Sequence, residues 1–204
     1  ENPHIPPGKP LDKLNFLWYS GLYRNVSLYV TDRLHITTPP QSNAPPGGGI
    51  ITGVRDVSSE SATLTLSAHV VNDDRMPRSF RMRNILLDAA GLEVASSLSE
   101  LTDLEPGQST RLMTRIMVMK PALWMPETPF LYTIRTELLS ENGSVTDSRE
   151  TRTGIRTVRF THDNGLMLNG QPVRLAGTNR HQEYPYIGYA LSDNASYRDA
   201  LKIK

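Results

Sequence analysis

The chain has 204 residues, with 22 basic side chains, 21 acidic side chains and no cysteine. The lack of cysteine excludes a disulfide framework and a thiolate metal site. The basic residues are scattered and indicate no nucleic-acid-binding face. No apolar run approaches the roughly 20 residues that cross a bilayer, and the first four histidines are too dispersed to indicate a metal site: His4, His35, His69 and His162. We expect no metal and no cofactor.

The start of the chain leaves the compartment open. Residues 1–7 lack the charged and apolar regions of a signal peptide. Because Glu1 is not methionine, we expect the sequence to come from a longer polypeptide, so cytoplasmic, periplasmic and secreted locations all remain open.

Residues 1–32 begin with prolines that exclude a helix, and then alternate between apolar and polar positions. The alternation predicts a half-buried strand, carried by Tyr23, Val26, Leu28 and Val30. We expect the nearby aromatic residues to pack in a core in preference to stacking on a sugar, namely Trp18, Tyr19 and Tyr23. Residues 37–49, rich in proline and glycine, predict a linker.

From residue 50 to residue 160, strand patterns recur at short intervals, which is typical of a β-sandwich. The alternation is clearest over residues 63–70, and turns are expected at Gly91, at residues 104–108 and at Asn142-Gly143. Over residues 112–119 one face carries three methionines, which indicates a surface covered by a neighbouring domain: Met113, Met117 and Met119.

Residues 166–183 combine a hairpin with a cluster of polar side chains. Asn169-Gly170 predicts a two-residue turn, because both central positions of a type I′ turn need positive φ. Alternation over residues 173–176 predicts a short strand that ends at Gly177. The polar residues that follow it directly are Asn179, Arg180, His181 and Glu183.

Four segments in order resemble glycoside hydrolase family 2. Residues 18–28 resemble the "GGIYRDV" strand that closes the family's sugar-binding jelly roll, and residues 121–132 resemble its "P-x-LWSPE-x-PxLY" segment. Residues 154–158 resemble its "GFRTV" strand, and residues 177–181 resemble its "GVNRH" motif. The segments follow one another in the family's order, so the resemblance extends along nearly the whole chain. The sequence departs from the family at Gln182 and Glu183, which leaves the exact sugar contacts open.

The resemblance implies an all-β fold, with an immunoglobulin-like β-sandwich flanked by a jelly-roll closing strand and the opening strand of a (β/α)₈ barrel. Residues 1–32 are then expected to end the sugar-binding domain. Residues 33–160 are expected to form the sandwich, and residues 161–204 to start a truncated TIM barrel. The sandwich is expected to hold its two neighbours in position.

The resemblance further implies a retaining β-galactosidase as the parent enzyme. Such enzymes use two carboxylates, which in this family lie downstream, so no catalytic residue is expected within the chain and the chain alone is expected to be inactive. Residues just past a barrel strand face the active site. We therefore expect substrate binding by His181, Asn179 and Arg180. For Asn179 a structural bond in the strand-end turn is equally open, and Arg180 is expected to brace the catalytic carboxylates or the loop in preference to touching the substrate. Glu183 is not expected to be the general acid.

Two alternatives stay open. One is a β-glucuronidase-like parent, although residues 184–190 favour the galactosidases. The other is a stand-alone carbohydrate-binding or adhesion module, which accounts for the β pattern but not for a barrel motif in the right order. The expected partner is a carbohydrate, a β-galactoside, with no nucleic acid or membrane, and homo-oligomerisation is left open.

Overall fold

The computed structural model describes residues 22–23, 25–26, 28–38 and 49–203. The predictions made for Trp18, Tyr19 and most of the linker, residues 39–48, lie outside the described residues. Contacts divide the chain into a larger unit, residues 30–174, and a smaller one that includes residues 175–203. The domain boundary expected after residue 160 falls inside a strand, β10 (Val158–Thr161), which belongs to the larger unit.

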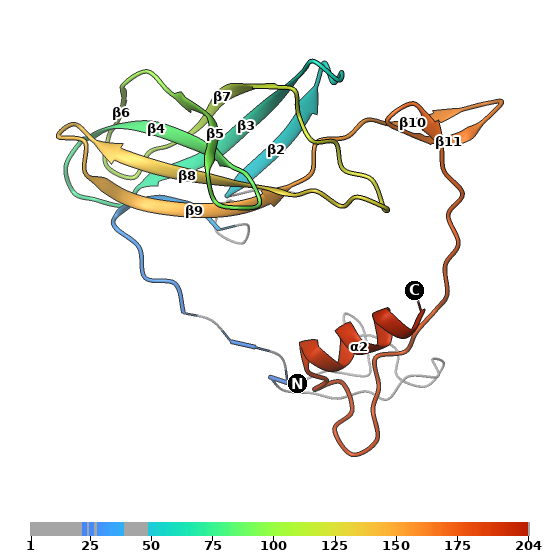
Figure 1. Ribbon diagram of the computed structural model, residues 1–204. Helices are drawn as coiled ribbons and strands as arrows, with labels where there is room; N and C mark the ends of the chain where they lie inside the picture. The colour runs from blue at the N-terminus through green and yellow to red at the C-terminus, as the bar shows by residue number, and fades with distance from the viewer. Residues whose placement is uncertain (1–21, 24, 27, 39–48, 204) are drawn as a thin grey trace. The chain divides into compact units, whose positions relative to one another are not determined.

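Two antiparallel sheets form the body of the larger unit (Figure 1). The four-stranded sheet has β3 at its centre, paired with β7 on one side and with β2 and β1 on the other: β1 (Leu34–Ile36), β2 (Ile50–Arg55), β3 (Ser61–Asn72) and β7 (Ser109–Met119). The five-stranded sheet has the order β5-β4-β8-β9, with β6 also paired to β4: β4 (Arg78–Leu87), β5 (Glu93–Leu98), β6 (Thr102–Leu104), β8 (Tyr132–Ser140) and β9 (Val145–Thr153). The predicted all-β sandwich is therefore confirmed.

Strict alternation in sequence becomes alternation in burial along β3. Every second residue from Ala62 to Asn72 is buried, because successive side chains of a strand point to opposite faces. On β7, Ile116 and Val118 face the core as predicted, whereas the three methionines on the other face are 64–70% exposed. The residues that the structure describes do not cover this methionine face.

The turns form where glycine or asparagine predicts them. Gly91, Gly107 and Gly143 all have positive φ. At the β8–β9 hairpin the amide of Gly143 donates to the Ser140 carbonyl at 2.8 Å, and the register shifts at Leu138/Leu139. Asn142 lacks the positive φ of a type I′ turn, so this connection is a longer turn with a bulge.

The core between the sheets consists of two apolar clusters. The first combines Leu64 and Ile116 of one sheet with Leu86 and Ile134 of the other. The second lies further along the strands. The four-stranded sheet contributes Leu34, Ile36, Ala68 and Val70 to it, and the five-stranded sheet contributes Phe80, Met82, Leu104 and Leu138. Burial of such side chains contributes about 1.5–3 kcal/mol each and is the main force that holds the sheets together.

A polar row crosses the core between these clusters. The Asn84 side chain donates to the Thr114 hydroxyl at 2.8 Å and accepts from the Thr136 hydroxyl at 2.6 Å. Asn84 and Thr136 are fully buried. Since Thr114 belongs to the opposite sheet, the row joins the two layers by hydrogen bonds.

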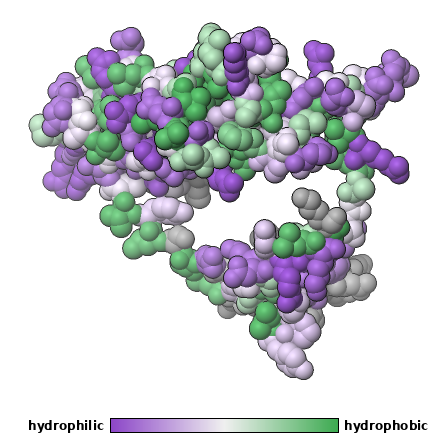
Figure 2. Space-filling view, in the orientation of Figure 1, coloured by the Kyte–Doolittle hydropathy of each residue, from purple (hydrophilic) through white to green (hydrophobic). Residues whose placement is uncertain are grey.

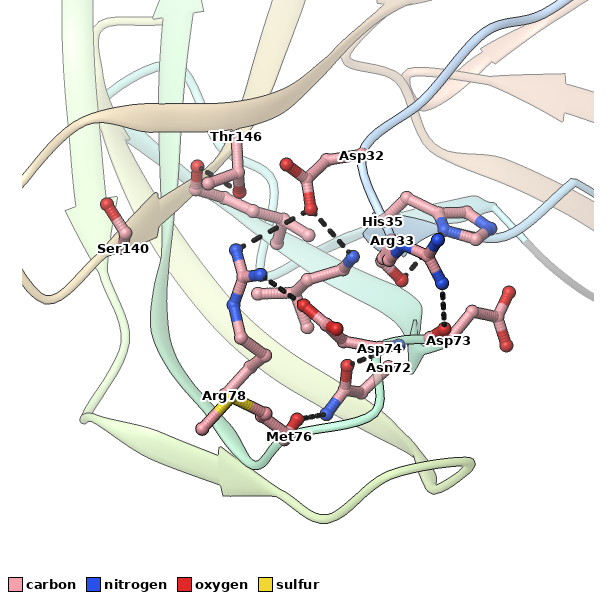
Figure 3. A network of polar contacts seen from close by, with 12 residues as sticks. Asp32, Arg33, His35, Asn72, Asp73, Asp74, Met76, Arg78, Ser140 and Thr146 are labelled. Carbon is pink, nitrogen blue, oxygen red and sulfur yellow. Dashed lines mark hydrogen bonds and ion pairs between the residues drawn. The ribbon is translucent and has the colours of Figure 1, made fainter.

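A second polar network closes the end of the sandwich where β1 begins (Figure 3). Arg78 on β4 forms ion pairs with Asp74 at 2.7 Å and with Asp32 at 3.5 Å, and Asp32 also accepts from the amide of Leu34 at 3.0 Å. A backbone hydrogen bond from Arg75 and the side-chain hydrogen bond from Arg78 lower the pKa of the Asp74 carboxyl. The network thus connects the chain before β1 to the β3–β4 turn.

His69 lies on β3, where its Nδ1 is 2.9 Å from the hydroxyl oxygen of Thr37. Burial, and then the positive charge of Arg111, lower the pKa of the His69 imidazole. Arg111 stands opposite His69 in the register between β3 and β7. The neutral form of this histidine is therefore favoured in the fold.

A separate three-stranded sheet follows the sandwich, in the order β10-β11-β12, with β11 (Gly165–Leu168) and β12 (Gln171–Pro172). Asn169 and Gly170 connect its last two strands with φ of 49° and 78°. The predicted two-residue turn is confirmed, since both central residues have positive φ.

Two predicted strands are not formed. The described residues from Leu22 to Asp32 carry no strand, and Leu22, Val26, Leu28 and Val30 are 75–89% exposed. Residues 173–183 also have no strand structure. A strand depends on the neighbours with which it pairs, and among the described residues the only backbone bond to a strand from either stretch is from the Val173 amide to the Leu166 carbonyl.

A helix that the sequence analysis did not anticipate, α2 (Asp193–Ile203), ends the described chain. With 11 residues it is much shorter than a bilayer crossing, and among the described residues no helix has the length and apolar character of a membrane span. On the face of the sandwich that Figure 2 shows, hydrophobic and hydrophilic residues are interspersed.

Candidate functional site

The polar cluster predicted after the hairpin lies on an irregular segment, residues 175–191, within the smaller unit. A turn closes this segment on itself, because Tyr184 and Gly188 form an antiparallel bridge in which the Tyr184 amide donates to the Gly188 carbonyl at 3.1 Å. Tyr186 and Gly188 within the turn have positive φ. No strand leads directly into His181, because β12 ends at Pro172 and residues 173–183 are irregular, so its place at the end of a barrel strand stays a prediction.

Helix α2 holds this segment through two arginine contacts. Arg180 donates from Nε to the Asp199 carboxylate at 2.9 Å, and its Nη2 makes a second, shorter bond to the same oxygen. Arg198 donates to the Tyr184 hydroxyl at 2.7 Å. The helix begins after Ser192, whose hydroxyl accepts from the Ala195 amide at 3.4 Å in the manner of an N-cap.

A hollow of about 390 Å³ lies over the segment. This volume falls in the roughly 300–1,000 Å³ range of small-molecule sites. The described residues that line the hollow are rich in hydrogen-bonding groups: Asn179, Arg180, His181, Gln182 and Tyr189. Amide, imidazole and phenol groups donate and accept hydrogen bonds, so the lining suits a polyhydroxylated ligand.

The carboxylates near the hollow are engaged in protein contacts. Glu183 accepts from the Tyr189 hydroxyl at 2.6 Å, and the Tyr189 ring lies 6.0 Å from that of Tyr23, at 38°. Asp199 is paired with Arg180. None of the described lining residues is a carboxylate, so these residues alone do not provide the acid and nucleophile of a retaining glycosidase.

The structure brings together Asn179, Arg180 and His181, the three residues predicted for substrate binding. Arg180 pairs with Asp199 through a single carboxylate oxygen, and its bracing of the catalytic carboxylates stays a prediction. Sequence reasoning missed Tyr189 as a lining residue and Asp199 as the partner of Arg180. The signal for α2 was present, because Ser192 followed by Asp193 is typical of a helix start.

Neither the hollow nor the sandwich shows a metal centre in the described part of the chain. No three acidic, histidine or cysteine side chains there converge at the distances of a metal site. The described lining of the hollow offers hydrogen bonding by amide, imidazole and phenol groups, beside a guanidinium that is paired with a carboxylate.

The match to a known family covers the sandwich. The model for the glycosyl hydrolases family 2 matches residues 51–156, just over half of the chain. The chain belongs to glycosyl hydrolase family 2. The segments that first suggested the resemblance extend beyond the matched residues, to the polar cluster at Asn179–His181.

Relatives of this family 2 chain include two β-galactosidases. The protein of Thermoanaerobacter pseudethanolicus is 30% identical over 205 residues, which cover 100% of this chain and 25% of that protein. The protein of Bacteroides ovatus is 31% identical over 192 residues, which cover 93% of this chain and 21% of that protein. The family 2 chain therefore spans about a quarter of the length of the curated relatives it matches.

A solved structure extends the likeness to a second activity in the family. The β-glucuronidase of Bacteroides uniformis superposes with a TM-score of 0.82 at 30% identity, over 94% of the family 2 chain and 23% of that structure. The fold is therefore shared between relatives named for different sugars, and fold alone does not distinguish the substrates.

Proposed function

We propose that this chain is part of a retaining β-galactosidase and that Asn179, Arg180 and His181 contribute to its sugar site. The observation that carries the proposal is the hollow lined by hydrogen-bonding side chains, in a family whose members hydrolyse glycosides. The β-galactosidases among the relatives, aligned over nearly the whole chain, support the same substrate class.

Each residue has a distinct role in this proposal. The His181 imidazole forms a hydrogen bond with a sugar hydroxyl. This hydrogen bond strengthens as positive charge develops on the sugar ring in the transition state. The Asn179 amide adds a second polar contact. Arg180 acts through its ion pair with Asp199, which holds the segment on helix α2. The acid and the nucleophile, about 5 Å apart in retaining enzymes, are expected from other parts of the polypeptide.

The ion pair between Arg180 and Asp199 favours a galactoside over a glucuronide. A glucuronide carries a carboxylate, which a free guanidinium would bind in a bidentate manner. Arg180 is the only guanidinium among the described residues that line the hollow, and Asp199 already neutralises it. The likeness to a β-glucuronidase structure favours the other substrate, so glucuronide hydrolysis is the second candidate function.

The assay that tests the proposal uses the complete polypeptide that carries these residues, with nitrophenyl β-galactoside and nitrophenyl β-glucuronide compared at equal concentration. A kcat/KM that is higher for the galactoside supports the proposal, and preference for the glucuronide replaces it with the second candidate. Hydrolysis of neither substrate, together with galactose binding by the 204-residue chain in calorimetry, would instead support a non-catalytic carbohydrate-binding module.

A further inference from the structure

Asn169 makes contacts that its turn does not require. Its backbone amide donates to the Thr157 carbonyl at 3.0 Å, and its side-chain Oδ1 accepts from the Thr157 backbone amide at 2.8 Å. Its Nδ2 donates to the Trp124 carbonyl at 3.0 Å and lies 3.1 Å from the Met125 sulfur. One side chain thus joins the β11–β12 turn to two segments that lie 12 and about 45 positions away in sequence.

The segment that receives these bonds is itself held on the sandwich. The Trp124 amide donates to the Ile155 carbonyl at 2.9 Å, next to a parallel bridge between Leu123 and Ile155. The indole packs directly on Gly154, and the Arg156 guanidinium lies 5.2 Å from the ring centre. Asn169 therefore bonds to a segment that is attached to the core, because Ile155 is fully buried in the first apolar cluster.

Asparagine suits this position for two physical reasons. Its φ is 49°, a left-handed conformation that asparagine adopts more readily than other residues with a Cβ. Its amide also supplies an acceptor and a donor at once. Glycine would keep the conformation and lose both bonds, whereas aspartate would keep the acceptor and lose the donor.

The Asn-Gly turn at Asn142-Gly143 differs from this one. Asn142 accepts hydrogen bonds from Ser140 and Ser144 within its own turn. The turn is exposed, and the hydrogen bonds described for Asn142 all stay within residues 140–144.

We propose that Asn169 is a positioning residue, which holds the β10–β12 sheet on the sandwich so that the chain starts toward the sugar site from a defined point. The Val173 amide still bonds to the Leu166 carbonyl of this sheet at 2.9 Å. The residues that line the hollow begin soon after it in sequence, at Asn179. The functional half of this inference rests on the proposed role of Asn179–His181. The structural half, attachment of the sheet through Asn169, is independent of it.

The structural half is tested by hydrogen exchange on the 204-residue chain. Asn169→Gly removes the acceptor of the Thr157 amide, so we expect that amide to exchange about ten- to a hundredfold faster. Asn169→Asp keeps this acceptor and should largely preserve the protection at Thr157. Asn142→Gly is the matched control and should leave Thr157 unchanged.

Tryptophan fluorescence reports the second contact. In a Trp18→Phe background, Trp124 is the remaining indole of the chain, and we expect its emission to change in both Asn169 variants but not in Asn142→Gly. Unaltered exchange at Thr157 and unaltered emission in Asn169→Gly would overturn the attachment.

Kinetics in the complete polypeptide decide the functional half. Asn169→Gly should lower kcat/KM by about ten- to a hundredfold at a temperature where the variant is folded, because small displacements of binding groups have effects of this size. Asn142→Gly should match the wild type. If the Asn169→Gly enzyme has wild-type kinetics although its Thr157 amide exchanges faster, Asn169 is not a positioning residue for the sugar site. If the wild type hydrolyses neither glycoside, the proposed function fails while exchange and fluorescence still decide the attachment.

Discussion

Asn84 accepts a 2.6 Å hydrogen bond from Thr136 in a layer of the core whose neighbours along both strands are apolar. Met82 and Leu86 flank Asn84, and Ile134 and Leu138 flank Thr136, all fully buried. Asn84 also donates to Thr114 of the opposite sheet. A one-residue slip of either strand would remove these partners from one another, so the row favours the observed register as well as adding stability.

We expect Thr136→Val to lower the free energy of unfolding by about 1–3 kcal/mol, because the buried Asn84 oxygen then loses its donor. Thr133→Val is the matched control on the same strand, where the side chain faces outward, and should change stability by less than about 0.5 kcal/mol. Urea unfolding followed by circular dichroism measures both. Equal effects of the two substitutions would mean that the hydrogen bond contributes nothing specific.

Gly154 leaves no room for a side chain. A Cβ there would lie 2.9 Å from the Trp124 Cβ, so Gly154→Ala should destabilise the sandwich by about 1–3 kcal/mol through overpacking. At Gly177 a Cβ meets nothing within 4 Å, and Gly177→Ala should be close to neutral. The prediction is checked by thermal unfolding, and a Gly154→Ala midpoint equal to that of the wild type contradicts it.

Stability should depend on pH through His69. Its pKa in the folded state lies below the ordinary 6.5, so the unfolded chain binds a proton first as the pH falls. The contribution of the neutral imidazole is therefore complete above about pH 6.5 and is lost as the pH falls from there toward the folded-state pKa. Urea titrations from pH 7.5 to pH 5 should show a smaller loss of stability in His69→Gln than in the wild type. The same substitution at the exposed His162 controls for removal of a histidine. If His69→Gln loses as much stability as the wild type between pH 7.5 and pH 5, the pH dependence does not come from His69.

The 204-residue chain by itself should not hydrolyse aryl β-galactosides, because the described residues lining its hollow include no carboxylate. A chromogenic assay at high protein concentration is sufficient. Saturable hydrolysis that persists through a second purification would show that a catalytic pair exists within these residues.

In the complete polypeptide, His181→Ala should lower kcat/KM by about a hundred- to a thousandfold, equivalent to about 3–4 kcal/mol of transition-state stabilisation. Thermal stability should change little. Arg180→Ala should differ by lowering both activity and stability, since it leaves the Asp199 carboxylate with only the longer ion pair to Arg198, at 4.0 Å, among the described residues. Wild-type kinetics in a folded His181→Ala protein would remove this histidine from the sugar site.

The sequence by itself determined the features that depend on near neighbours. Alternation along β3 predicted its buried face, and Asn169-Gly170 predicted a turn with two positive φ values, because both follow from the local geometry of the backbone. The ordered motifs predicted the family for the same reason, since they require no knowledge of contacts.

Only the tertiary structure decided which distant residues meet. The sequence pattern of β4 does not distinguish the buried Asn84 from an exposed asparagine. The local sequence also does not pair Asn169 with Trp124, or Arg180 with Asp199. The same principle explains the strands that were predicted around Tyr23 and Val173 but are absent from the described residues. Alternation makes a segment able to form a strand, whereas hydrogen bonds from a neighbouring strand are what hold it in that conformation.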